Sequence, residues 1–471
     1  MRSAKSIIPK KIKALGWNKL SKNFLLCASF FILSASKIFS QDNSPYSRYG
    51  LGDIVPNTNI VNRAMGGISA AYSDPLTVNF NNPASYSSFM TRVLARSKKS
   101  IDGRVILDVG MNFDTRTLRE GNPPSKFTVS NALFSYMQVG IPLRRNWGLS
   151  FGLRPVSKIA YDIVRREKLY DPNTGLPIDS SFTEFTGNGG VFLPSIGTGV
   201  AIGKINTLSI GLNVGYLFGR KEYSTKRAFI NDSVQYNNGN YTTSTSFGKV
   251  FLNGGIQYKI KFKKDRSLTL GAFGNLKQIL DASQDIIRET FIRDPNSGDL
   301  TLDSVYYQKG LKGKIIYPAS YTVGFVYERE LSKDYSGFLL GIDLVQTQWS
   351  DYRYYGTTDA VKNNMEVRIG TQLRPIPKSN YFSNVDYRAG FFIGQDYINL
   401  GNKLPVFGVS FGLGLPIPNT NPLARGQFTR VNLALEYNKR GNNANLLKED
   451  MFRISLGMNF SDLWFGKHKY D

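Results

Sequence analysis

The amino-acid sequence predicts an all-β protein, a transmembrane antiparallel β-barrel of about fourteen strands. Three observations support this fold class: apolar and polar residues alternate over long segments, short and long connections alternate, and an export signal precedes them. The chain has 471 residues, including 45 Gly, 31 Phe and 26 Tyr. Glycine suits crowded sheet positions, and aromatic rings favour the two membrane interfaces.

Period-two alternation is clearest in Leu208–Phe218, Phe407–Leu415, Val431–Asn438 and Phe452–Phe460. In each segment, apolar side chains form one face, while the other face is rich in Gly, Ser and Asn with a few charged residues. A soluble β-sandwich would show the same alternation. Its strands, however, typically have about five or six residues, whereas these segments suit the length of a tilted membrane strand. The pattern therefore favours the barrel.

The connections give the strand count, because outer-membrane barrels have short periplasmic turns and longer external loops. Short connections are predicted near 144–146, 203–206, 263–266, 331–335, 375–380 and 416–426. Longer ones are predicted near 120–126, 167–183, 228–243, 293–307, 351–364, 398–403 and 441–449. This arrangement predicts about fourteen strands with both ends periplasmic, although 302–330 has room for either one strand or two.

The N-terminus has the pattern of a secretory signal peptide. Met1–Lys22 is basic and lacks acidic residues, an apolar run follows from Phe24 to about Phe39, and Ser40 precedes Gln41. Residues 1–40 are therefore predicted to be cleaved, the alternative being an uncleaved membrane anchor. The single cysteine, Cys27, lies in this part, so the mature chain would have no disulfide, thiol nucleophile or Cys metal ligand.

The charge balance is basic, at +24 for the whole sequence. Without the eight Lys and Arg of residues 1–40, 51 basic residues remain against 35 acidic ones, a charge of +16. No basic stripe or recognition helix accompanies this excess, so nucleic acid is not expected as a partner. The basic residues are spread among predicted turns and loops, which suits contact with solvent or lipid headgroups.

Residues 41–100 lack long alternation and are predicted to form a hatch, a plug inside the lumen. The barrel is assigned to residues 101–465 and a basic periplasmic tail to 466–471. The segments Asn62–Gly67 and Asp74–Ala84 combine a glycine pair, an acidic residue and an Asn-Pro-Ala triplet. In this order they resemble the N-terminal hatch of the FadL family of outer-membrane transport proteins. The ending after the last strand looks like a form seen in Bacteroidota members.

The resemblance makes the triplet Asn82, Pro83 and Ala84 the hatch motif. It implies uptake of long-chain fatty acids or similar hydrophobic compounds through a hatch-gated barrel, with lateral exit into the bilayer. A lateral opening requires interrupted strand pairing, and proline lacks the N–H that a ladder needs. Pro155 is therefore a candidate for the kink at such an opening. An ordinary bulge near the rim would tolerate the same proline.

Several charged residues are predicted to face the lumen, because they alternate with apolar residues of the lipid-facing surface. An inward arginine suits a fatty-acid carboxylate, but equal numbers of acids and bases favour a structural ion-pair network. The six residues are Glu366, Arg368, Asp386, Arg388, Glu436 and Arg453.

Catalysis, a metal site and a cofactor are not predicted. The only histidine, His468, lies beyond the last strand, and no convincing set of ligands for zinc is present. The predicted partners are outer-membrane lipids, a hydrophobic small molecule and other outer-membrane or periplasmic subunits. Two functions stay open for this protein of the outer membrane: a hydrophobic-compound channel, or a non-transporting barrel within a larger protein secretion or assembly complex.

Overall fold

The computed structural model describes residues 44–93, 100–121, 124–203, 206–230, 237–263, 265–294, 298–418 and 427–464. The predicted signal peptide (1–40) and the predicted basic tail (466–471) lie outside the described residues. Within the described ranges, no helix combines the length and the apolar character needed to cross a membrane.

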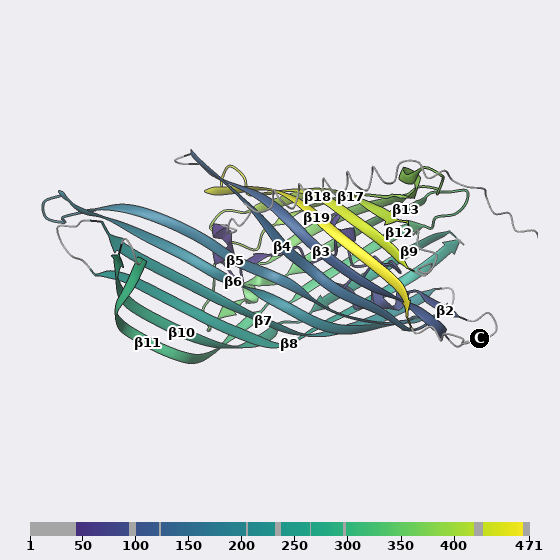
Figure 1. The fold of residues 1–471 in the computed structure, drawn as a ribbon, viewed down its shortest axis with the longest axis horizontal. Helices are drawn as coiled ribbons and strands as arrows, with labels where there is room; N and C mark the ends of the chain where they lie inside the picture. The colour runs from purple at the N-terminus through teal and green to yellow at the C-terminus, as the bar shows by residue number, and fades with distance from the viewer. Residues whose placement is uncertain are drawn as a thin grey trace, which may run out of the picture. The chain divides into compact units, whose positions relative to one another are not determined.

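A closed ring of fourteen antiparallel strands forms the wall in the described part of the chain (Figure 1). In ring order the strands are β3 (Ser100–Gly121), β4 (Pro124–Arg144), β5 (Trp147–Tyr170), β6 (Pro177–Ile202), β7 (Thr207–Phe229), β8 (Asn238–Lys263), β9 (Arg266–Asn275), β12 (Ser320–Arg329), β13 (Gly337–Thr347), β15 (Asn364–Arg374), β16 (Asp386–Gln395), β17 (Pro405–Ile417), β18 (Phe428–Arg440) and β19 (Leu447–Trp464). Pairing of β19 with β3 closes the ring. The predicted fold class and strand count are confirmed.

The wall is apolar outside and polar inside, which β7 illustrates. Ile210, Leu212 and Val214 are exposed on its outer face, while Ser209 and Asn213 are buried on its inner face. This arrangement is the reverse of a soluble protein and is the pattern of a membrane barrel. A single closed sheet also rules out the sandwich alternative.

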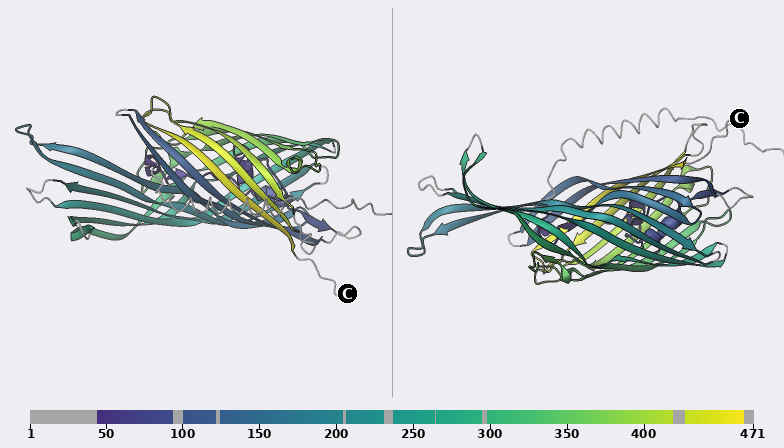
Figure 2. Two further views of the ribbon diagram at one scale, coloured as in Figure 1. Left: turned by 45° about the horizontal axis from the view of Figure 1, so that its top comes forward. Right: turned by 90° about the horizontal axis from the view of Figure 1, so that it is seen from below.

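The wall extends beyond the ring at one end, which we call the long-loop end because residues 171–176, 396–404 and 441–446 connect strands there. The hairpin of β10 (Gln278–Asp294) and β11 (Gly298–Tyr317) adds to the first part of β8, whereas β9 pairs with its last part. We call the extended portions of β5, β6, β7 and β8, together with β10 and β11, the projecting sheet (Figures 1 and 2).

The projecting sheet departs from the predicted loops. The sequence predicted connections at 167–183 and 293–307, but β5 continues to Tyr170, β6 begins at Pro177 and β11 begins at Gly298. The signal at Asp171 marks a tight turn between long strands, in which Gly175 N–H donates to the Asp171 carbonyl at 2.9 Å. The stretch 302–330 contains part of β11 and the whole of β12, and only β12 belongs to the ring.

The interior holds residues 44–90, which we call the lumenal segment. Its elements are η2 (Pro45–Arg48), β1 (Asp53–Ile54), α2 (Ile60–Arg63) and η3 (Pro83–Ser88), and β2 (Thr91–Val93) follows it and pairs with β3. Ile60, Phe80 and Tyr86 pack with the wall residues Ile106 and Tyr136 in one buried cluster. Much of the space inside the ring is therefore filled by the chain itself.

The Asn82-Pro83-Ala84 triplet lies against a row of glycines on the inner wall. Gly148, Gly199, Gly211 and Gly255 are successive cross-strand partners on β5, β6, β7 and β8. A Cβ at Gly211 would lie 2.5 Å from the Ala84 nitrogen, and one at Gly255 would overlap the Asn82 side chain. Without side chains in this row, the backbone of the lumenal segment approaches the backbone of the wall.

Asn82 also organises the triplet itself. Its side-chain oxygen accepts a hydrogen bond from Ala84 N–H at 3.1 Å, which caps η3, and its Nδ2 donates to the Ala70 carbonyl at 2.6 Å. Proline at the first position of η3 has no N–H to satisfy. The triplet therefore forms a buried, capped turn.

The opposite wall holds the middle of the lumenal segment. Gly370 and Gly390 are cross-strand partners, and the backbone of Met65 and Gly66 lies directly against them. Ser69 and Ala70 N–H groups donate to the buried carboxylate of Asp343 on β13 at 2.6 and 2.8 Å. Both sides of the barrel thus fix the lumenal segment through its backbone.

We expect that a single methyl group added at one glycine of this row displaces the lumenal segment. Gly211→Ala should lower the free energy of unfolding by about 1–3 kcal/mol, because the added Cβ overpacks the contact with Pro83 and Ala84. Urea unfolding of the refolded barrel in detergent, together with trypsin cleavage within residues 44–90, would measure the effect. Gly254→Ala is the matched control on the neighbouring strand, since its nearest atom is 4.0 Å away. Equal behaviour of the two variants would contradict this role for the row.

Candidate functional site

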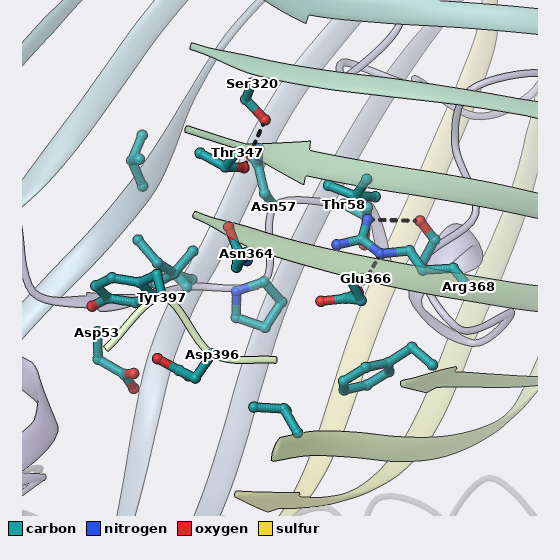
Figure 3. Close-up of a pocket in the computed structure, with 18 of the residues that line it drawn as sticks. Asp53, Asn57, Thr58, Ser320, Thr347, Asn364, Glu366, Arg368, Asp396 and Tyr397 are labelled. Atoms are coloured by element: carbon teal, nitrogen blue, oxygen red, sulfur yellow. Dashed lines mark hydrogen bonds and ion pairs between the residues drawn. The ribbon is translucent and has the colours of Figure 1, made fainter. Parts of the chain in front are cut away.

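A cavity of about 350 Å³ lies between the lumenal segment and the long-loop end of the wall. Figure 3 shows side chains of the lumenal segment, such as Asp53 and Asn57, facing Asn364 and Glu366 of the wall and Asp396 of the connection 396–404. Charged and amide groups line part of it, and apolar side chains such as Val156, Leu193 and Phe251 line the rest.

One part of the cavity is an ion-pair cluster that fixes β1. Asp53 pairs with Arg116 at 2.9 Å and with Arg440 at 3.0 Å, and Glu449 pairs with Arg116 at 2.5 Å. Burial on its own raises the pKa of the Asp53 carboxyl, but the two guanidiniums outweigh burial and hold the pKa below its ordinary value. The cluster therefore keeps Asp53 ionised and bonded to the wall.

A second pair, predicted from the sequence as inward-facing, lines the same cavity. Arg368 Nε donates to Glu366 at 2.6 Å, and Arg368 Nη1 donates to the Gly67 carbonyl at 3.2 Å (Figure 3). The two side chains thus satisfy each other and brace the lumenal segment.

The predicted pair Asp386 and Arg388 belongs to a further buried cluster. Arg388 Nη2 lies 3.0 Å from Asp386, and Arg430 reaches the same carboxylate at 3.0 Å. Nearby, Arg374 pairs with Asp74 of the lumenal segment at 2.6 Å. Burial raises the pKa of the Asp74 carboxyl, but Arg374 and Arg430 outweigh it, and the pKa lies below its ordinary value.

The last two predicted charges meet on neighbouring strands. Arg453 pairs with Asp114 at 2.6 Å and with Glu436 at 3.4 Å. Arg63 of α2 lies close by and donates to Asn112 Oδ1 at 2.5 Å. All six predicted charges therefore have oppositely charged partners in the wall, and the preference for a structural network over a ligand site stays a prediction.

The pairing between β4 and β5 is interrupted near Pro155, and we call this interruption the parting. Pairing of the two strands ends at Met137 and Leu153, and among the described residues no β4 partner follows for β5. The β5–β6 register shifts between Pro155 and Ser157, so Pro155 lies at a bulge as well as beside the parting. The sequence analysis offered two interpretations of Pro155, a kink at a lateral opening or an ordinary bulge. The interrupted pairing and the bulge thus occur at the same place.

The parting is covered from inside by residues 44–55, which we call the strap. β1 pairs with β5 at Ser157 and Lys158, and Val55 N–H donates to the Val156 carbonyl at 3.1 Å. Ser44 N–H donates to the Ala160 carbonyl at 3.2 Å. The strap therefore takes the place that a continued β4 would occupy along this part of β5.

An apolar groove of about 560 Å³ lies on the outer face at the same level. Its lining includes Met137, Phe151, Leu153, Pro194 and Tyr216. Facing the cavity on the inner side of the wall is Arg154, which is 7% exposed. Its guanidinium lies over the Phe80 ring at 5.0 Å, and its Nη1 has no hydrogen-bond partner among the described residues.

Several of these residues were not singled out from the sequence. Alternation along β5 places Ser150 and Arg154 on the inner face, so the pattern within the strand predicted between the connections at 144–146 and 167–183 was enough to find Arg154. The strap cluster of Asp53, Arg440 and Glu449 carries no sequence signal, because its members come from distant segments. No group of side chains suited to hold a metal ion is found in the described ranges.

Comparison with known proteins gives one family match and several remote structural neighbours. The CymD monoaromatic hydrocarbon channel is 15% identical, with 88% of this chain and 98% of that chain covered and a TM-score of 0.48. A FadL homologue from Pseudomonas aeruginosa is 12% identical, with 88% and 98% covered and a TM-score of 0.48. The toluene transporter TbuX from Ralstonia pickettii is 11% identical, with 87% and 99% covered and a TM-score of 0.48.

No curated protein matches the sequence. The likeness to a FadL homologue is thus limited to remote structural similarity, whereas the family model that matches is BamG, over residues 20–471. Because this match covers nearly the whole chain, the protein belongs to the BamG family.

Proposed function

We propose that this protein is a closed outer-membrane barrel that serves as a subunit of a larger protein secretion or assembly complex. The observation that carries the proposal is the fixation of the lumenal segment on opposite walls, by glycine rows and by Asp343. The match to BamG, and not to a channel family, supports the same role.

Moving the lumenal segment would be unfavourable. Asp343 would lose two backbone donors and Asp74 would lose Arg374, and each buried polar group left unsatisfied costs about 1–3 kcal/mol. Removing one partner of a buried ion pair costs about 3–5 kcal/mol. A barrel that opened in each transport cycle would have to offset several such losses, whereas a permanently closed subunit would not.

The ion pairs that line part of the cavity support the same interpretation. An apolar solute gains free energy by leaving water for apolar surroundings, and the part of the lining that is ionised offers little of that gain. In the proposed subunit, the ion pairs instead brace the wall and the strap.

A disulfide lock distinguishes a closed subunit from a gated channel. Ile54 and Ser157 are cross-strand partners, so Ile54→Cys with Ser157→Cys should form a disulfide that holds the strap on β5. For a closed subunit, we expect the oxidised variant to co-purify with the same outer-membrane and periplasmic proteins as the unaltered chain, in the same ratios.

The two single-cysteine variants are the controls for this lock, and purification in mild detergent with quantitative mass spectrometry is the measurement. A chain that purifies alone, both unaltered and locked, would overturn the subunit proposal. Loss of oleate uptake on oxidation, restored by reductant, would establish the gated channel instead.

A second candidate function, uptake of a hydrophobic compound, is favoured by one observation. The parting beside Pro155 lies next to an apolar outer groove and to Arg154, which faces the cavity without a carboxylate partner among the described residues. Together they suit an amphiphilic anion, with its charge at the guanidinium and its chain towards the bilayer.

For the channel, organic extracts of the gently purified barrel should contain a fatty acid or similar amphiphile by mass spectrometry. Arg154→Gln and Pro155→Ala should each deplete it several-fold, and the Asn82-Pro83-Ala84 triplet replaced by three alanines should do the same. Arg166→Gln, on the outer face of β5, is the control. An empty lumen in every variant, also after incubation with oleate, would remove this candidate.

A further inference from the structure

The projecting sheet carries a continuous row of side chains on one face. Each member is the cross-strand partner of the next, and paired residues in an antiparallel sheet point to the same side. The row crosses β5, β6, β7, β8, β10 and β11 and consists of Ile163, Phe185, Thr225, Tyr241, Arg288 and Tyr306.

This face is the one that continues the inner surface of the barrel. Tyr223, two residues before Thr225 on β7 and so on the same face, donates from its hydroxyl to the Arg48 carbonyl of the strap at 2.9 Å. Beyond that contact the row extends past the strap. Tyr241 and Tyr306 are 54% and 42% exposed, so nothing in the described chain covers that end of the row.

The opposite face differs in kind. The adjacent row, which points the other way, begins with Asp162, Thr186, Ser224 and Thr242 before it reaches Ile287 and Tyr307. A sheet with one aromatic face and one largely polar face normally packs the aromatic face against something else. The projecting sheet has no second layer of its own among the described elements.

Arg288 determines which kind of group this face would bind. Its guanidinium lies over the Tyr306 ring at 5.3 Å and over the Tyr241 ring at 5.9 Å, and no carboxylate pairs with it in the described part of the chain. Flanking rings hold an arginine in place and leave its donors for a carboxylate. Tyr and Arg are also the residues most enriched at the energetic centres of protein interfaces.

We infer that the aromatic face of the projecting sheet, centred on Tyr241, Arg288 and Tyr306, is the docking surface for an acidic protein subunit on the external side of the membrane. The inference rests on the proposed function and names the surface through which that subunit is bound. Charge complementarity selects an acidic partner, because Arg227 and Arg165 lie further out on the same face and share the single carboxylate of Glu167.

Adjacent tyrosines provide a matched test, since Tyr306 and Tyr307 are both exposed and point to opposite faces. A photo-crosslinking amino acid at Tyr306 should link to a subunit that also co-purifies stoichiometrically with the unaltered chain. The same amino acid at Tyr307 should give at least about tenfold less of that product. Crosslinking is done in whole cells before purification, with the product identified by mass spectrometry.

Reversing the charge at Arg288 is a second test of the docking surface. Arg288→Glu should reduce retention of the crosslinked subunit about tenfold or more, because like charges would face each other in the interface. Arg166→Glu, the same change on the opposite face of β5, should leave retention unchanged. Arg288→Ala should lie between the two, and the circular dichroism of all three should match the unaltered barrel.

The outcomes separate this inference from the proposed function. If the unaltered chain retains its subunits and Arg288→Glu retains them equally, the docking surface is wrong while the subunit role stands. Crosslinks to a glycolipid at Tyr306, or equal protein crosslinks at both tyrosines, would also overturn it. A chain that purifies without any subunit overturns both.

Discussion

The close approach of two backbones, that of the lumenal segment and that of the wall, is the constraint on which the rest of the structure depends. It exists because four paired glycines on β5–β8 and two more on β15–β16 present no side chain to the interior. With the lumenal segment held there, Asp53 and Asp74 reach arginines of the wall. The cavity, the strap and the paired charges all follow from this placement.

The ion pairs explain why a wall with so many buried charges can be stable. A buried guanidinium or carboxylate is tolerated when it is paired and hydrogen-bonded. Arg116, Arg440 and Arg453 each meet that condition through residues on neighbouring strands or on the strap. Arg154 differs from these three, since its Nη1 has no hydrogen-bond partner among the described residues, and it lies where the wall itself is interrupted. The buried arginine without an ion-pair partner in the described chain and the interrupted strand pairing therefore occur at the same point of β5.

Alternation along the strands predicted the barrel, because a period of two fixes which side chains face lipid, and the alternation of short and long connections predicted its strand number. The period of two also placed Arg453 and Glu436 in the lumen, where each is paired. It could not predict the projecting sheet, since the turn signal at Asp171 looks the same for a tight turn as for a long loop. The position of the strap could not be predicted from the sequence either, because its pairing with β5 joins residues more than a hundred positions apart.

The location of the strap has a consequence for the order of assembly. Residues 44–55 lie on the far side of α2 from the point where β2 joins the wall, so the chain passes through the ring along its axis. Threading it into a finished cylinder would force side chains such as Tyr86 past glycine contacts that leave no clearance. Closing the ring around a segment already in position avoids that barrier. The seam between β19 and β3 is then the last to form, and residues 44–55 become the template around which the remainder is wound.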